Sequence, residues 1–215
     1  MLPLSEFDIM IEYILSKEGI GGMKKSDLKR FINIPTLKTE RLVLRKITNK
    51  DLLDVFEYAS DVRVSEYLLW SPHPDKAYTR AYLSLLSKKY RAGEFYDWGI
   101  EYRGKIIGTC GFTSFSIEHN VGEIGYVLSS KFWGQGIASE AVRAVIKFGF
   151  EVLELNRIEA KFMAENEKSH KLLDKLGLVY EGKKKEAVFA KGIYRDVCIS
   201  AITNNGYQTK LAQEN

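Results

Sequence analysis

One segment restricts the possible folds of this chain more than any other, because it joins a predicted strand to a predicted helix through a glycine-rich turn. The strand covers 121–128, the turn contains Gly134 and Gly136, and the helix covers 136–153. Glycines at such a turn let a ligand approach the backbone closely, and the N–H groups of the first helical turn attract an anion. The segment therefore predicts a phosphate site, although the same glycines could serve only to reverse the chain.

The elements just before this segment are predicted to be antiparallel. Strands at 96–102 and 105–115 are separated only by Arg103-Gly104, the spacing of a tight hairpin. A Walker A loop is excluded because the turn lacks the Gly-Lys-Ser/Thr ending. A Rossmann unit needs parallel neighbours and a glycine where Ser139 stands, although Glu159 lies at the distance of its ribose-binding acid. The hairpin argues against a Rossmann unit, and dinucleotide binding stays an alternative.

Hydrophobic periodicity extends the prediction to the rest of the chain. The other predicted strands are 41–47, 157–163, 178–190 and 194–203, and the other predicted helices are 50–59, 75–91 and 168–176. Leu53 and Val152 are among the apolar residues expected on the buried faces of their helices. We therefore predict one α/β (α+β) domain with a mixed, mostly antiparallel sheet and helices on both faces.

The two ends of the chain are predicted to lie outside this domain. Near the start, Ser5 and Asp8 resemble a capping box, and apolar residues recur at helical spacing until Gly19. We expect an N-terminal helical appendage at 1–35, the main domain at 36–204 and a C-terminal tail at 205–215.

Composition excludes several classes of protein. The 215 residues are 45% hydrophobic and 28% charged, and 32 Lys and Arg against 28 Asp and Glu give a net charge of +4. This excess is spread along the chain, so nucleic acid is not indicated as the main ligand. Cys110 and Cys198 stand alone, which predicts neither a disulfide nor a metal site. With no predicted membrane span or signal peptide, we expect a cytoplasmic protein, monomeric or homodimeric.

The glycine turn resembles the acetyl-CoA loop of the GNAT superfamily of N-acetyltransferases, whose pattern is Arg/Gln-x-x-Gly-x-Gly/Ala. Gly136 and Ala138 match its last fixed positions, whereas Trp133 replaces the Arg or Gln. This replacement leaves any side-chain contact of Trp133 with phosphate an open question. Four further segments in the same order are similar to the RimJ/RimL branch, which includes N-terminal acetyltransferases of ribosomal proteins: 39–45, 123–126, 166–169 and 192–196.

The resemblance implies a sheet splayed at the two strands that flank the cofactor helix, with acetyl-CoA bound there as co-substrate. A backbone N–H, that of Val127 in our prediction, would face the thioester carbonyl. The residues expected to contact the cofactor are Val127, Leu128, Gly134, Gln135, Gly136, Ile137, Ala138, Ser139 and Asn166.

The resemblance also implies catalytic roles. Ser169 is expected to act as the general acid that protonates the leaving thiolate, while Asn166 could equally be a simple helix cap. Glu123 is expected to act as the general base. Asp97 and Glu101 on the neighbouring strand are alternatives to Glu123, as is water alone.

The acceptor is expected to be a primary amine, and the resemblance implies the N-terminal amine of a ribosomal protein. Its contacts are expected from the two helices after the first strand, the loop with Trp70 and the turn with Tyr194 and Asp196. His73 is expected to be a surface loop residue without a role. The alternatives are a small amine such as a polyamine or an antibiotic, a non-catalytic acyl-CoA-binding scaffold, and an RNA-binding protein.

Overall fold

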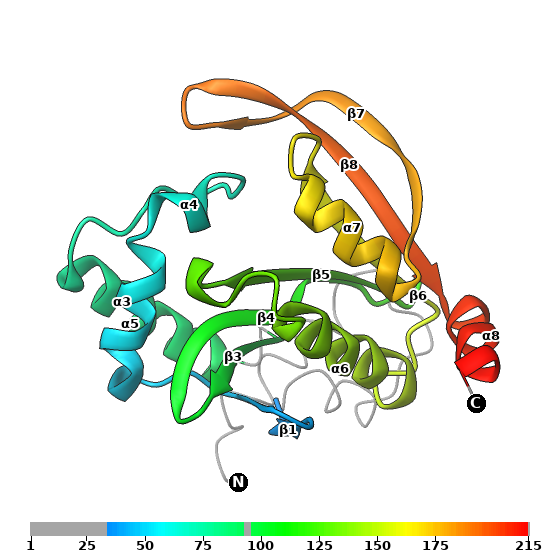
Figure 1. Ribbon diagram of the computed structural model, residues 1–215, viewed down its shortest axis with the longest axis horizontal. Helices are drawn as coiled ribbons and strands as arrows, with labels where there is room; N and C mark the ends of the chain where they lie inside the picture. The colour runs from blue at the N-terminus through cyan, green and yellow to red at the C-terminus, as the bar shows by residue number, and fades with distance from the viewer. Residues whose placement is uncertain (1–33, 93–95, 215) are drawn as a thin grey trace, which may run out of the picture.

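The computed structural model describes residues 34–92 and 96–214. The appendage predicted at 1–35 lies almost wholly outside these residues. Within them the chain forms one open sheet of eight strands in the order β1-β2-β3-β4-β5-β6-β8-β7 (Figure 1). The strands are β1 (Leu37–Lys38), β2 (Leu42–Arg45), β3 (Tyr96–Tyr102), β4 (Lys105–Ser116), β5 (Val121–Leu128), β6 (Arg157–Met163), β7 (Val179–Ala190) and β8 (Ile193–Thr203).

The sheet is splayed between β5 and β6, as predicted. These two strands form the one parallel pair in the described sheet, and they pair only over 121–124 and 157–160. Beyond Ile124 the pairing ends, which leaves the edge of β5 from Gly125 to Leu128 uncovered by β6. The predicted mixed, mostly antiparallel sheet is therefore confirmed.

Helices cover both faces of the sheet. They are η1 (Asn49–Asp51), α3 (Leu52–Ala59), α4 (Val62–Ser65), α5 (Lys76–Ala92), η2 (Ser130–Phe132), α6 (Ile137–Glu151), α7 (Glu167–Leu176) and α8 (Asn204–Glu214). On β5, Tyr126 contacts α7, whereas the next residue, Val127, lines a cavity with α3 and α5. Because successive side chains of a strand point to opposite faces, α7 lies on one face and α3 with α5 on the other. On the α7 side, α6 packs against β4 and β5.

Large apolar side chains of the sheet meet α6 in the core. Trp98 of β3 is fully buried and contacts Phe148 of α6 edge to face, with ring centroids 5.4 Å apart. Such aromatic pairs add stability beyond the area they bury. This packing fixes α6, and with it the glycine turn that precedes the helix.

Most predicted elements are present, and β3, β5 and β6 have the predicted bounds. Three segments differ from the prediction. The strand predicted at 41–47 is shortened to β2 and preceded by the unpredicted two-residue β1, the four-residue α4 was not predicted, and the segment expected as a C-terminal tail is largely the helix α8. Tyr207 of α8 stacks on Phe150 with ring centroids 4.9 Å apart, which anchors that helix to the domain.

Two residues expected to face the core are exposed. Leu53 is 61% exposed, because Val55, Tyr58 and Ala59 form the buried face of α3. The start of that face is set by the η1 turn, where Thr48 and Asp51 form a capping box. Val152 is 48% exposed, because α6 ends at Glu151 and the chain turns away there.

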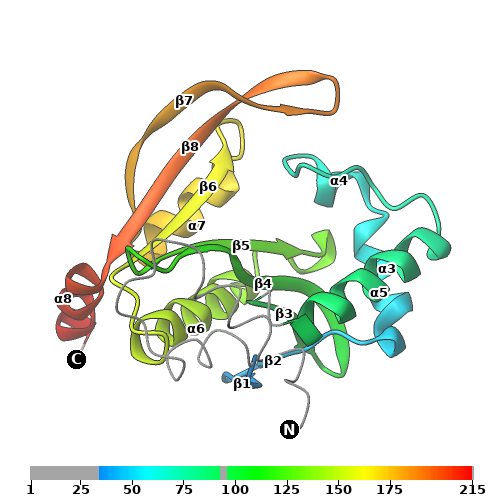
Figure 2. The ribbon, with the colours of Figure 1, turned by 180° about the vertical axis from the view of Figure 1, so that it is seen from behind.

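The β7–β8 hairpin extends from the splayed half of the sheet toward α4 (Figure 1, Figure 2). At its tip, the Lys191 ammonium donates to the carbonyl oxygens of Ser65, the last residue of α4, and of Glu66, its C-cap. The hairpin and α4 are therefore tied together. Among the described helices, none combines the length and apolarity needed to cross a membrane.

Candidate active site

Among the described residues, the glycine turn leaves backbone N–H groups unpaired at the start of α6. Gly134 and Gly136 both have left-handed backbones, with φ of +76° and +75°, which explains why glycine occupies both positions. Gly136 is the N-cap of α6, and it has no side chain that could accept from the first helical turn. The N–H groups of Ile137, Ala138 and Ser139 therefore remain available to an anion, supported by the positive end of the helix dipole.

A clamp from the β1–β2 turn holds this helix start in place. Glu140 accepts from the Thr39 hydroxyl at 2.5 Å and from the backbone N–H and Nε of Arg41 at 2.9 and 2.6 Å. Arg41 Nη1 also donates to the carbonyl oxygen of Gln135 at 3.0 Å. Segment 39–45 is one of the motifs of the family resemblance, but its sequence predicts no role for it. The structure shows that two of its residues position the turn.

Trp133 links the end of β5 to α7. Its indole N–H donates to the Leu128 carbonyl oxygen at 2.9 Å, and the Lys168 ammonium lies 4.1 Å from its ring centroid. Lys168 therefore brings a positive charge to the position where the Arg or Gln of the resembled pattern is missing.

The register of β4 and β5 corrects the predicted role of the Val127 N–H. The Ser129 N–H donates to the Ile107 carbonyl at 2.8 Å, and pairing continues without a shift through Leu128 and Val127. Backbone groups alternate in direction along a strand, so the Val127 N–H also points at β4. The N–H groups of Tyr126 and Leu128 instead point at the edge that β6 leaves open.

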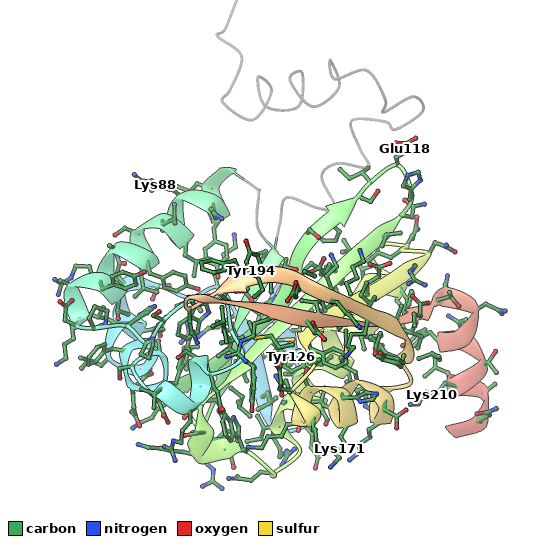
Figure 3. The ribbon with its side chains drawn as sticks, turned by 90° about the horizontal axis from the view of Figure 1, so that it is seen from above. Lys88, Glu118, Tyr126, Lys171, Tyr194 and Lys210 are labelled. Atoms are coloured by element: carbon green, nitrogen blue, oxygen red, sulfur yellow. The ribbon has the colours of Figure 1, made fainter. Side chains whose placement is uncertain are left out.

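Ser169 and Tyr126 meet beside this open edge. Ser169 is buried, and its Oγ lies 2.5 Å from the hydroxyl oxygen of Tyr126. Figure 3 shows Tyr126 near the middle of the molecule, where the sheet meets α7. Burial raises the pKa of Tyr126, which keeps its hydroxyl protonated at neutral pH. Tyr126 belongs to the Glu-Ile-Gly-Tyr segment of the sequence, but nothing local identified it as the partner of Ser169.

Asn166 is the N-cap of α7, and its Oδ1 accepts from the Ser169 N–H at 3.1 Å. The interpretation of Asn166 as a helix cap is therefore confirmed. The cap fixes the first turn of α7, which places the Ser169 hydroxyl next to Tyr126. A contact between Asn166 and a cofactor remains a prediction.

The structure does not bring Glu123 to Ser169. Glu123 and Val127 share the opposite face of β5 and are four residues apart, or about 13 Å along the strand. The Glu123 carboxylate lies 2.5 Å from the Lys161 ammonium and 3.5 Å from the Ser114 hydroxyl. Glu101, an alternative base, is paired with Arg45 at 2.5 Å. The predicted basic role of Glu123 would therefore have to be exerted through water.

An apolar cavity of about 490 Å³ lies on the other face of β5, between α3, α5 and the sheet. His73 lines it and is buried, so its expected place on the surface was wrong. Its Nδ1 lies 2.9 Å from the Thr79 Oγ1, and its ring contacts three aromatic residues. Burial lowers the pKa of His73, which leaves the ring neutral. The lining residues are Val55, Tyr58, Ala59, Trp70, His73, Tyr78, Ala81, Tyr82, Leu85, Thr109 and Val127.

The Asp97 carboxyl, close to the tyrosines of this cavity, has a raised pKa that can be tested. Loss of hydration raises its pKa to about 7, and Tyr82 and Tyr90 lie close enough to interact with its charge. Because the folded pKa exceeds the unfolded value, the proton held by Asp97 stabilises the fold at low pH, and this contribution disappears between about pH 4 and 7. The loss is on the order of 2–4 kcal/mol.

Changing Asp97 to Asn should remove this pH dependence. We expect the melting temperature of the variant, relative to wild type, to be higher at pH 8 than at pH 5. Thermal unfolding at both pH values measures the difference, and Glu118→Gln on an exposed turn is the control that should leave the dependence intact. An Asp97→Asn effect of equal size at both pH values would contradict the assignment.

Comparison with known proteins agrees with this geometry. Residues 41–179 match the family described as Acetyltransferase (GNAT) domain. The chain is 38% identical to the uncharacterized N-acetyltransferase p20 of Bacillus licheniformis, over 80% of this chain and 98% of that protein. It is 27% identical to the [ribosomal protein uS5]-alanine N-acetyltransferase of Escherichia coli, over 80% of this chain and 93% of the relative.

A solved structure extends the similarity to three dimensions. The crystal structure of a GNAT-family acetyltransferase from Bacillus anthracis superposes with a TM-score of 0.71 and 29% sequence identity. The match covers 80% of this chain and 99% of that one. The residues that match the GNAT family, 41–179, include the glycine turn, the open edge of β5 and the start of α7.

Proposed function

This chain belongs to the GNAT family of N-acetyltransferases, and we propose that it transfers the acetyl group of acetyl-CoA to a primary amine. One observation carries the proposal. The anion site at Gly136, the uncovered edge of β5 and the buried Ser169 hydroxyl all border the same splayed part of the sheet. A held acyl carrier, an oxyanion donor and a proton donor are what thioester aminolysis requires.

The donor end of the site fits a coenzyme with phosphate groups and an amide-containing arm. The N–H groups at the start of α6 would bind the pyrophosphate, with Lys168 as a nearby cation. The open backbone groups of Tyr126 and Leu128 would pair with the arm as an additional strand does. The Leu128 carbonyl already accepts from Trp133, whereas the Leu128 N–H at the end of β5 stays open as a donor.

The reaction follows from this arrangement. The amine nitrogen attacks the thioester carbonyl, and the Leu128 N–H, rather than that of Val127, stabilises the resulting oxyanion. The amine proton leaves through water toward Glu123. As the tetrahedral intermediate collapses, the C–S bond breaks and the Ser169 hydroxyl protonates the thiolate. Tyr126 holds the Ser169 oxygen at 2.5 Å and can return a proton to it.

For the acceptor, the relatives support the N-terminal amine of a protein. The Escherichia coli relative is named for the alanine of ribosomal protein uS5. Release of free thiol from acetyl-CoA tests the activity, with peptides of different first residues and small amines as acceptors. Binding of acetyl-CoA without transfer to any acceptor would instead favour a non-catalytic acyl-CoA-binding protein.

The anion site gives a direct prediction for coenzyme binding. Changing Gly136 to alanine would place a Cβ in a left-handed backbone, which costs about 1–2 kcal/mol. Because no atom other than Arg41 Nη2, at 3.5 Å, would contact this Cβ, the strain arises from φ alone. If the turn relaxes, its N–H groups shift, and we expect the Kd for acetyl-CoA to rise about tenfold.

Gly104→Ala is the matched control for this experiment. Gly104 has nearly the same φ, +77°, and its Cβ would meet nothing within 4 Å, but it lies in the β3–β4 turn. Calorimetric titration should give a wild-type Kd for Gly104→Ala. An unchanged Kd for Gly136→Ala would show that the turn does not bind the phosphates.

A further inference from the structure

The cavity under α5 adjoins the place where acetyl transfer would occur. Val127 lines it, and the next residue, Leu128, carries the proposed oxyanion donor. The cavity lies on the face of β5 opposite to Tyr126 and Ser169. A molecule bound there would therefore approach the thioester from the side away from the proton donor. This is the position that an acceptor must take.

The described lining of the cavity carries no ionised side chain. Its side chains are aliphatic, aromatic or hydroxyl-bearing, apart from the neutral His73. The His73 Nδ1 atom is hydrogen-bonded to the Thr79 hydroxyl, at 2.9 Å. A polyamine or an aminoglycoside would bring several charges into this space. Asp97, which is close enough to Tyr58 and Tyr82 to interact with them, could balance at most one of these charges, so burial of the others is costly.

The mouth of the cavity is an apolar stripe on α5. Tyr78, Ala81, Tyr82 and Leu85 follow each other at helical spacing and all line the cavity. Tyr78 and Leu85 are nevertheless each 53% exposed. Apolar side chains gathered at the mouth of a pocket are typical of a surface that a ligand covers.

The volume indicates the size of that ligand. About 490 Å³ falls within the range of pockets that enclose small organic ligands. The methyl group of an N-terminal alanine would leave most of this space empty. Ring stacking is available from Trp70 and Tyr82, whose rings both contact His73.

We propose that the acceptor is a primary amine that carries an uncharged, aromatic-sized apolar group, and that the cavity under α5 binds this group. The inference rests on the proposed acetyl transfer and narrows its acceptor. The same chemistry occurs in a peptide with a large apolar first residue and in a free arylalkylamine, so the experiment includes both. The acceptor thus differs from the alanine named for the Escherichia coli relative.

The test compares four acceptors with acetyl-CoA: a peptide beginning with Phe, the same peptide beginning with Ala, phenethylamine and spermidine. We expect kcat/KM for the Phe peptide or for phenethylamine to exceed that of the Ala peptide and spermidine at least tenfold. The faster of the two bulky amines shows whether the acceptor is a peptide N-terminus or a free arylalkylamine. Equal or faster transfer to the Ala peptide or spermidine would overturn the proposal.

A binding measurement separates this proposal from the proposed function. Calorimetric titration of phenethylamine into the protein saturated with coenzyme A reports on the cavity without any reaction. Binding without transfer to any acceptor would support the cavity and contradict the proposed activity. Absence of phenethylamine binding, together with slow transfer to the bulky acceptors, would overturn the acceptor proposal alone.

Two variants of α5 test whether the preference for bulky acceptors arises from the cavity. Ala81 is exposed and lines the cavity, so Ala81→Phe should fill its mouth without disturbing the core. We expect at least a tenfold loss of kcat/KM for the bulky acceptor and an unchanged KM for acetyl-CoA. Ser84→Phe, exposed on the same helix but outside the lining, is the matched control. An unchanged preference between the Phe and Ala peptides in Ala81→Phe would contradict the assignment.

Discussion

Changing Ser169 to alanine is expected to lower kcat about 100-fold, the contribution typical of a positioned general acid. Its hydroxyl is buried beside the open edge of β5, where the thiolate leaves in the proposed reaction. The Asn166 cap is made to the backbone N–H of residue 169, so alanine keeps it. Steady-state kinetics should therefore show a wild-type affinity for acetyl-CoA together with the loss of turnover.

The variant Tyr126→Phe distinguishes the role of Ser169 as proton donor from that of its hydrogen-bond partner Tyr126. This variant keeps the buried ring and removes the hydroxyl that lies 2.5 Å from Ser169 Oγ. We expect a smaller loss of kcat than in Ser169→Ala, because the serine keeps its own proton. Full turnover in Ser169→Ala, with a large loss in Tyr126→Phe, would move the acid role to the tyrosine.

Changing Gly108 to alanine is expected to have the largest effect on stability. The added Cβ would lie 2.1 Å from the Val127 carbonyl oxygen and 3.0 Å from the Leu128 Cα. Both are backbone atoms, so no side-chain rotation can relieve the overlap, and β4 and β5 must move apart. We expect a decrease of about 3 kcal/mol or more in the free energy of unfolding, with loss of transfer because Leu128 shifts.

Denaturant unfolding measures this decrease. Gly104→Ala is the control. Gly104 lies in the turn just before β4, where a methyl group would enter open space at φ +77°. This substitution should cost only the backbone strain of about 1–2 kcal/mol. A Gly108→Ala variant as stable as Gly104→Ala would show that the close approach of β4 and β5 is unnecessary for folding.

The elements that could be predicted are those whose signals are local. β3 was bounded correctly because alternation ends at the Arg103-Gly104 turn, where both residues adopt positive φ. α7 could be placed because Asn166 caps its start and the left-handed Gly177 ends it. By contrast, α4 has only four residues, too few to show a helical period.

Errors arose where the packing of another element decides the environment of a residue. His73 stands between two prolines in a loop that looks exposed. It is buried because α5 brings Thr79, Tyr78 and Tyr82 against it. The orientation of the Val127 N–H likewise depends on the register with β4, and a shift of one residue would reverse it.

By itself, the sequence determined the order of elements, the mixed sheet and the glycine turn that begins α6. These follow from side-chain period, from capping and from the backbone conformations that only glycine adopts readily, all of which act over a few residues. The tertiary structure alone decided that Tyr126 meets Ser169, that Arg41 and Thr39 clamp Glu140, and that an uncharged cavity adjoins Val127. Those contacts join residues 43 to 101 positions apart or elements on opposite faces of a strand, and packing of the whole sheet sets them.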